Sequence, residues 1–361
     1  MDRAVFYEFI IVLLSVFALT AFLLRLIIPV LKSHKLGQPI KDIGPRWHKS
    51  KEGTPVMGGI GFILATLIVL LIISIVSWVR GTVAELVPLA LALGLAVANG
   101  MIGFFDDYCK LLKKQNEGLK AYQKYLLQLV VAAVYLLFMS ITGNLSIEFF
   151  IPFVKKAITI DSFMEKLTWV NNEYLIKVFY YAFKIFYYAI SLLLITGIVN
   201  SVNLTDGIDG LAASVTAVVG GFFAVLAFYI SRTNHAAGRS LSLLSSSVVG
   251  GTLGFLVYNW NPARVFMGDT GSLYLGGAVV GAAFMLNRPL VILIAGFVYV
   301  FEAISVILQV GVFKLSGRKK RLFKMAPFHH HLEKCGWKEV TIVCVFTLLT
   351  VGFCVAAWFS I

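Results

Sequence analysis

Long runs of apolar residues separated by short polar segments dominate this chain from end to end. A helix needs about 20 apolar residues to cross the hydrocarbon of a bilayer. Because these runs are too long and too continuous for barrel strands, and spanning segments must satisfy their backbone hydrogen bonds internally, the pattern predicts ten transmembrane α-helices. The runs cover approximately residues 5–31, 56–79, 84–105, 123–143, 175–199, 211–230, 242–260, 270–286, 289–313 and 339–360.

The longest polar interruption covers residues 144–174 and contains a short alternation of apolar and polar positions. Phe149 and Ile151, followed by Ile158 and Ile160, give the two-residue period of a strand, so the segment predicts a small β-hairpin outside the membrane. The other loops are too short for a second domain. Residues 1–361 are therefore expected to form one membrane-embedded domain.

Composition supports the same fold class. The chain is 59% hydrophobic and 14% charged, with a mean hydropathy of +0.88. Soluble domains have about 25% charged residues. The sequence thus predicts an all-α polytopic membrane protein.

A net charge of +13 is a feature of nucleic-acid-binding proteins, but its distribution has another explanation. Alternate loops between the predicted helices carry 20 Lys and Arg residues on one face and 8 on the other. Positively charged loops stay in the cytoplasm, which predicts that both termini lie outside and that no nucleic acid is bound. The basic loops are 32–55, 106–124, 200–210, 259–270 and 314–338.

Five aspartates lie where apolar runs meet these predicted cytoplasmic loops: Asp106, Asp107, Asp206, Asp209 and Asp269. Placing a charged residue inside the bilayer costs at least about 2.5–3.5 kcal/mol. Carboxylates at the ends of spanning helices therefore indicate a functional role. Five of them on one face indicate a metal site, a phosphate site or both.

Asp106 and Asp107 end the third predicted helix, where the helix dipole is already negative. A cation such as Mg²⁺, which binds carboxylates and substrate phosphates, would offset this charge. Lys110 follows one turn later and is positioned to pair with Asp106. The alternative is a solvated acidic pair at a helix end.

Two further loops carry acids beside glycines. Asp206 and Asp209 lie in a loop expected to open the sixth helix, and Asp269 precedes the eighth. Free N–H groups at a helix start favour phosphate, and the turn around Gly268 can accept an anion. The alternative for each is a simple capping turn.

Three consecutive histidines, His329 to His331, lie in the basic loop before the last helix. Histidine serves as an acid, a base or a phosphate ligand near neutral pH, although a surface cluster is the alternative. Glu302 and Gln309, seven residues apart, share one face of the ninth predicted helix.

Taken together, these segments resemble the polyprenyl-phosphate N-acetylhexosamine-1-phosphate transferase superfamily, and most closely its phospho-N-acetylmuramoyl-pentapeptide-transferase (translocase I) branch. The resemblance covers nearly the whole chain in order, and Val56 stands where threonine is usual. The matching segments are GTPVMGG at 53–59, FFDDYCK at 104–110, GLKAYQK at 118–124, NLTDGIDGLA at 203–212, NPARVFMGDTGS at 261–272 and MAPFHHHLE at 325–333.

The resemblance implies transfer of phospho-MurNAc-pentapeptide from UDP-MurNAc-pentapeptide to undecaprenyl phosphate, giving lipid I and UMP. It implies a Mg²⁺ cofactor, a homodimer in the bacterial cytoplasmic membrane and a site on its cytoplasmic face. The implied catalytic residues are Asp106, Asp107, Asp269 and His329, the three aspartates also binding metal. The implied substrate-binding residues are Lys51, Thr54, Lys110, Lys124, Asn203, Asp206, Gly207, Ile208, Asp209, Asn259, Phe266, Gly268, Gln309 and His330.

Several alternatives stay open. A sister enzyme that uses UDP-GlcNAc shares most of the motifs, and acids among ten helices also suit an ion-coupled transporter. Transporter sites lie near the membrane midplane, whereas here only Glu302 is deep within a predicted helix. Asp106 is the candidate that orients or deprotonates the lipid phosphate. Direct displacement and a covalent phospho-aspartate route are both compatible with the sequence.

Overall fold

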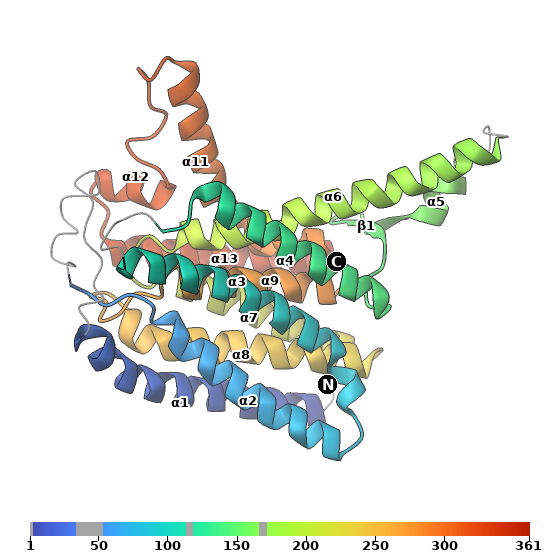
Figure 1. The fold of residues 1–361 in the computed structure, drawn as a ribbon, viewed down its shortest axis with the longest axis horizontal. Helices are drawn as coiled ribbons and strands as arrows, with labels where there is room; N and C mark the ends of the chain where they lie inside the picture. The colour runs from blue at the N-terminus through green and yellow to red at the C-terminus, as the bar shows by residue number, and fades with distance from the viewer. Residues whose placement is uncertain (1–2, 34–52, 113–117, 166–171) are drawn as a thin grey trace.

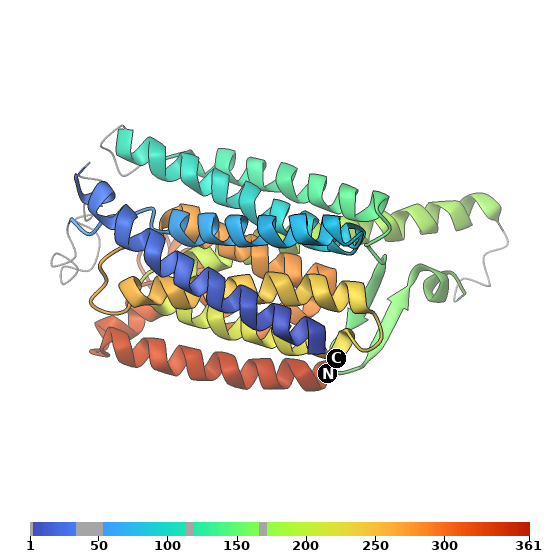
Figure 2. The same ribbon diagram turned by 90° about the horizontal axis from the view of Figure 1, so that it is seen from below.

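A computed structural model describes residues 3–33, 53–112, 118–165 and 172–361. These residues form a bundle of long helices with one small hairpin, which confirms the all-α prediction (Figures 1 and 2). The elements are α1 (Arg3–Ser33), α2 (Gly59–Val79), η2 (Val83–Leu86), α3 (Val87–Leu112), α4 (Ala121–Ile141), β1 (Glu148–Ile151), β2 (Lys156–Thr159), α5 (Ile160–Glu165), α6 (Glu173–Thr205), α7 (Leu211–Ile230), α8 (His235–Asn259), α9 (Gly268–Met285), η3 (Pro289–Val291), α10 (Ile292–Ala295), α11 (Phe297–Leu315), α12 (Phe328–Lys334) and α13 (Glu339–Ser360).

Within the described ranges, nine helices are long and apolar enough to cross a membrane, against ten predicted. The predicted segment 270–286 forms α9, which is not one of the nine. Its sequence is rich in glycine and alanine, and 16 of its 18 residues are buried in the bundle. A helix covered by protein on every side needs small residues for packing more than it needs the hydropathy of a lipid-facing helix.

The prediction of one continuous helix over 289–313 was wrong. The chain forms η3 and α10, breaks at Gly296, and continues as α11, which projects away from the bundle (Figure 1). A side chain at Gly296 would crowd the carbonyl oxygen of Ile292 and the ring of Tyr299. The break therefore needs a residue without a side chain.

The predicted hairpin is confirmed. β1 and β2 pair antiparallel, with Phe149 opposite Ile158. The ring of Phe149 packs against Tyr187 of α6 at 5.3 Å between centroids, and the Arg288 guanidinium lies 4.2 Å from the centre of the Phe150 ring. Both chain ends lie near this end of the bundle, whereas α3 ends and α9 begins near α12 at the other end (Figure 1).

A buried arginine ties four elements together at the end of the bundle that holds the termini. Arg239 of α8 donates from Nε and Nη2 to the two carboxylate oxygens of Glu8 in α1, at 2.8 and 3.0 Å. Its Nη1 donates to Oε2 of Glu85 in η2 at 3.0 Å, and Nη2 also donates to Oγ of Ser77 in α2 at 2.9 Å. The planar guanidinium thus fixes α1, α2 and η2 against α8.

We expect Arg239→Met to lower the free energy of unfolding by about 3 kcal/mol, because removing one partner leaves two carboxylates without their buried cation. Reversible unfolding in lipid–detergent micelles measures the change. Lys177→Met is the matched control, since the exposed pair of Lys177 with Glu173 contributes about 0.5 kcal/mol. Equal stability of the two variants would contradict the assigned role of Arg239.

Candidate active site

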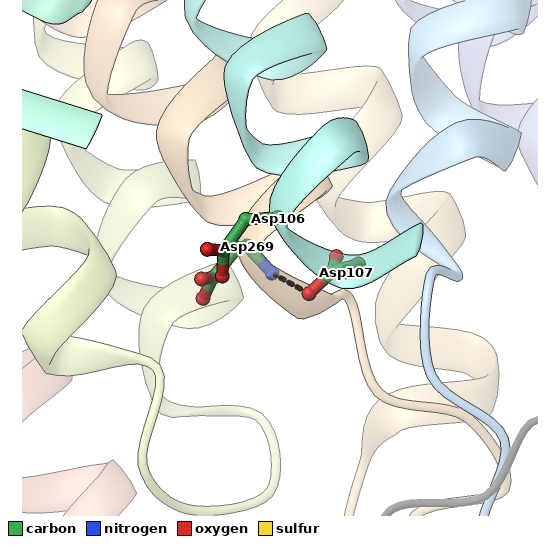
Figure 3. A group of neighbouring side chains, drawn as sticks. All are labelled: Asp106, Asp107 and Asp269. Carbon is green, nitrogen blue, oxygen red and sulfur yellow. Dashed lines mark hydrogen bonds between the residues drawn. The ribbon is translucent and has the colours of Figure 1, made fainter. Parts of the chain in front are cut away.

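Three carboxylates meet where α3 ends and α9 begins. One oxygen from each of Asp106, Asp107 and Asp269 lies within 4.8 Å of the others, and the first two residues are buried. Figure 3 shows Asp106 beside Asp269, with Asp107 next to the first turn of α9. The structure therefore confirms that these three predicted residues lie together, although Asp269 is more than 160 positions from the other two in the chain.

The first turn of α9 binds Asp107. Oδ2 of Asp107 accepts hydrogen bonds from the Thr270 backbone N–H at 3.0 Å and the Thr270 hydroxyl at 2.8 Å, and Oδ1 accepts from the Asp269 N–H at 3.3 Å (Figure 3). Unpaired N–H groups at a helix start suit an anion, so the carboxylate at the end of α3 occupies the start of α9. Gly268, with φ of 73°, makes the preceding turn, and a side chain there would crowd Oδ2 of Asp107.

Two lysines balance the acids. Nζ of Lys110 lies 2.6 Å from Oδ2 of Asp106 and 3.0 Å from Oδ2 of Asp269. Nζ of Lys124, from the first turn of α4, lies 2.8 Å from the same oxygen of Asp269. Oδ1 of Asp106 accepts from the backbone N–H of Leu119 at 2.8 Å. The FFDDYCK and GLKAYQK segments therefore converge on one cluster.

A glycine on α3 permits this convergence. A side chain at Gly103 would overlap the backbone of Asp269 and Thr270. Glycine lets two helix backbones approach closely, as at small-residue contacts in membrane bundles. Asp106 and Asp107, one turn later, thereby reach the start of α9.

The last turn of α6 lies against the carboxylate cluster. The amide nitrogen of Asn203 donates to Oδ1 of Asp269 and to the hydroxyl of Ser272, both at 2.8 Å. The loop leads directly into α7, as predicted, but Asp206 itself caps the C-terminal end of α6 and does not lie at the helix start. Helix α6 continues six residues past the predicted end, to Thr205.

The carboxyl group of Asp206 is perturbed by its surroundings. Burial, together with the nearby carboxylates of Asp269, Asp107 and Asp209, raises the pKa of Asp206 to about 8. A neutral carboxyl group can donate a hydrogen bond as well as accept one. In the absence of a cation, Asp206 therefore holds a proton at neutral pH.

Asp209 and Asn259 connect the loops around the site. Oδ2 of Asp209 accepts from the side-chain amide of Asn261 at 3.1 Å and from the Ala263 N–H at 2.9 Å. Asn259 accepts from the Gly210 N–H at 3.0 Å and donates to the Val265 carbonyl at 2.9 Å. Both side chains hold the 203–210 loop against the 259–266 segment.

His329 reaches the same loop from α12. It is fully buried, and its Nε2 lies so close to Gly207 that a side chain at Gly207 would overlap it. Its Nδ1 is 3.2 Å from Oε2 of Glu302 in α11. The ring of His330 points elsewhere, with Nδ1 2.6 Å from Oε2 of Glu333.

The remaining predicted residues are distributed around this site. Thr54 precedes Pro55, whose carbonyl accepts from the N–H of the half-buried Phe266 at 2.9 Å, and Ile208 is buried in the core. Gln309 binds backbone groups of Leu322 and Phe323 and does not reach the carboxylates in this structure. Lys51 lies outside the described residues.

The turn that was predicted to accept an anion contains Thr270 and Ser272, whose hydroxyls bind Asp107 and Asn203. Sequence reasoning missed two other residues that the structure places at the site. Asn261 and Glu339 lie together beside Asp209, with 3.2 Å between the Asn261 amide and Oε2 of Glu339. Glu339 begins α13, and nothing in its local sequence indicates that position.

The donor set fits a hard divalent cation. Carboxylate oxygens are the protein ligands that Mg²⁺ prefers. Asp106, Asp107 and Asp269 carry one more negative charge than Lys110 and Lys124 balance, and the lysines can turn to an incoming phosphate. With a divalent cation offsetting the carboxylates, the two lysines could neutralise phosphate groups at this end of the bundle.

Comparison with known proteins gives consistent matches. Residues 88–287 match the family described as glycosyl transferase family 4. Over 350 residues, covering 95% of both chains, the sequence is 43% identical to a phospho-N-acetylmuramoyl-pentapeptide-transferase of Clostridium novyi. Proteins of the same name from Caldanaerobacter subterraneus and Clostridioides difficile are 41% and 42% identical, with coverage of 93% and 95% of both chains.

We expect Gly103→Ala to destabilise the protein by about 1–3 kcal/mol, because the added methyl group forces α3 away from α9. Thermal unfolding in lipid–detergent micelles measures this change. Gly94→Ala on the same helix is the control, since the space around Gly94 is open and alanine favours a helix by about 0.5–1 kcal/mol. An unchanged unfolding temperature for Gly103→Ala would refute the close contact.

We expect Asp206→Asn to become more stable relative to the unmodified protein as the pH rises from about 4 to about 8. The folded protein keeps Asp206 protonated up to a pKa of about 8, whereas the unfolded chain releases this proton near 3.8. Ionising Asp206 therefore opposes folding progressively across this window, and asparagine removes the effect. Unfolding measured from pH 4 to 9 with chelator present tests it. A pH-independent difference would show that Asp206 is ionised in the fold.

Proposed function

Because the chain belongs to glycosyl transferase family 4, among the phospho-N-acetylmuramoyl-pentapeptide-transferases, we propose that it makes lipid I. In this proposal, phospho-MurNAc-pentapeptide passes from UDP-MurNAc-pentapeptide to undecaprenyl phosphate, and UMP is released. The three carboxylates with two lysines at one end of the bundle support it most strongly. Phosphoryl transfer depends chiefly on positioning and on neutralisation of charge, which such a cluster supplies.

Both substrates are anionic, and one of them is a lipid. The site therefore belongs at the membrane surface and near cationic groups, as the positions of Lys110 and Lys124 support. The proposal places the protein as a homodimer in the cytoplasmic membrane, with the site facing the cytoplasm. The excess of Lys and Arg in the loops at this face supports that orientation.

Asp106 is the aspartate that we assign to the lipid phosphate. Asp107 is held through both oxygens by the first turn of α9, so its geometry is fixed by the fold. Asp106 instead pairs with Lys110, whose flexible stem lets the pair rearrange when phosphate arrives. Asp106 then orients the attacking phosphate oxygen or accepts its proton.

Asp269, Asp107 and Asp106 are the residues that would hold Mg²⁺. Bound there, Mg²⁺ would offset the negative charge of the donor diphosphate and favour departure of UMP. Lys110 contributes positive charge among the three carboxylates, at 2.6, 3.7 and 3.0 Å from oxygens of Asp106, Asp107 and Asp269, and Lys124 contributes it at Asp269. Asn203 keeps Asp269 in place through its 2.8 Å hydrogen bond.

The uridine end of the donor is assigned to the loop that joins α6 and α7. Asp206, Gly207, Ile208 and Asp209 present backbone and carboxyl groups there, and the half-buried Phe266 ring offers a stacking surface for uracil. The remaining predicted residues, Lys51, Thr54, Asn259, Gln309 and His330, are assigned to the rim of the donor site.

We expect the purified protein with Mg²⁺, UDP-MurNAc-pentapeptide and undecaprenyl phosphate to release UMP. Asp269→Asn should lower kcat by about 10²–10³-fold, because it removes a charge that acts on the reacting phosphates. Asp161→Asn, an exposed residue of α5, is the control and should retain full activity. Quantifying UMP and the lipid product measures each rate.

Three results would overturn the proposal. Normal Mg²⁺-dependent UMP release by Asp269→Asn would remove the assigned role of the carboxylates. Faster turnover of UDP-GlcNAc would make the chain the sister enzyme. Solute uptake into vesicles without turnover of either nucleotide sugar would make it a transporter.

A further inference from the structure

Glu302 is a buried acid that the proposed chemistry does not use. It lies in α11, with none of its side chain exposed. Its Oε2 accepts a hydrogen bond from the Phe328 backbone N–H at 2.8 Å, and its Oε1 accepts one from the His329 N–H at 3.2 Å. These N–H groups belong to the first residues of α12. The carboxylate therefore caps the short helix that carries the histidines.

Glu302 also faces the imidazole of His329. Nδ1 lies 3.2 Å from Oε2 of Glu302, so the carboxylate favours the ring form with a proton on Nδ1. In the neutral ring, Nε2 then has a free lone pair. That nitrogen lies against Gly207. Both ring nitrogens are completely buried and have no hydrogen-bond partner among the described residues, so Glu302 acts on Nδ1 through its charge.

An orphaned, buried ring nitrogen at the predicted nucleotide loop indicates a ligand group that completes it. The three residues in contact come from different segments: Glu302 from α11, His329 from α12 and Gly207 from the loop between α6 and α7. Helix α11 also holds the chain before α12 through Gln309, which accepts from the Phe323 N–H at 2.8 Å. The position of His329 is thus set from α11.

We propose that Glu302 is a positioning residue that fixes His329 with Nδ1 protonated and Nε2 directed at the donor beside Gly207. The inference rests on the proposed function only for the identity of that donor. Glu302 touches no substrate in this arrangement and acts through the imidazole. Its carboxylate accepts from the N–H groups of Phe328 and His329 and places a negative charge 3.2 Å from Nδ1 of His329, a charge that an amide would not supply.

A double-mutant cycle tests the coupling. Glu302→Gln keeps an oxygen for the α12 N–H groups but cannot serve Nδ1 as a carboxylate, so kcat for UMP release should fall by about 10²-fold. In a His329→Ala background the same change should have no further effect, and Glu302→Asp should restore part of the rate. Ser305→Ala, one turn away on α11, is the control, because its hydroxyl bonds only the Glu302 backbone carbonyl at 2.6 Å. Equal loss in both backgrounds would overturn the proposal.

A second measurement needs neither turnover nor a Glu302 variant. In protein labelled with ¹⁵N-histidine, the His329 signals, assigned from their loss in His329→Ala, should show a protonated Nδ1. A neutral ring protonated on Nε2 would overturn the proposal. If the unmodified protein releases no UMP, the proposed function fails, while these signals still decide the role of Glu302.

Discussion

The close contact between α3 and α9 is the constraint on which the site depends. Gly103 lies against the Asp269 backbone, while Gly277 and Gly281 face α3 at Ala96 and Ala92. These small residues let the two backbones run close together along their length. The end of one helix consequently meets the start of the other, and the carboxylate of Asp107 pairs with the N–H groups of Thr270 and Asp269. An acidic helix end that would be unfavourable alone is stabilised by the dipole of its neighbour.

The packing of α9 also explains why charged groups can gather at this end. Because α9 is enclosed by other helices, its first turn is held by protein contacts. The carboxylate of Asp269 in that turn pairs with Lys110 and Lys124. At the end that holds the termini, Arg239 pairs with Glu8 and Glu85 and fixes the outer helices to α8. The Arg239 cluster joins helices and is structural. The carboxylate cluster at the other end has one more negative charge than its two lysines balance, which a divalent cation would offset, and its lysines are placed to meet anionic substrates.

Helices α11 and α12 contribute from outside the central packing. The break at Gly296 directs α11 away from the bundle, and Glu302 and Gln309 then fix the returning chain by its backbone groups. His329 is thereby brought to Gly207, 122 positions earlier in the sequence. A residue on a short surface helix becomes fully buried because a carboxylate on one side and a glycine on the other accommodate its ring.

The sequence by itself determined the membrane class, most helix positions, the hairpin and the identities of the three clustered aspartates. Apolar runs and charged loops report these features locally, since each helix must satisfy its own backbone and match the bilayer. Tertiary structure alone decided that α9 is enclosed, that the ninth segment breaks at Gly296 and that Asp206 ends a helix. It also decided that Glu302 lies beside His329. Two residues on different helices become neighbours through the packing of those helices, which the local spacing of residues in the chain does not encode.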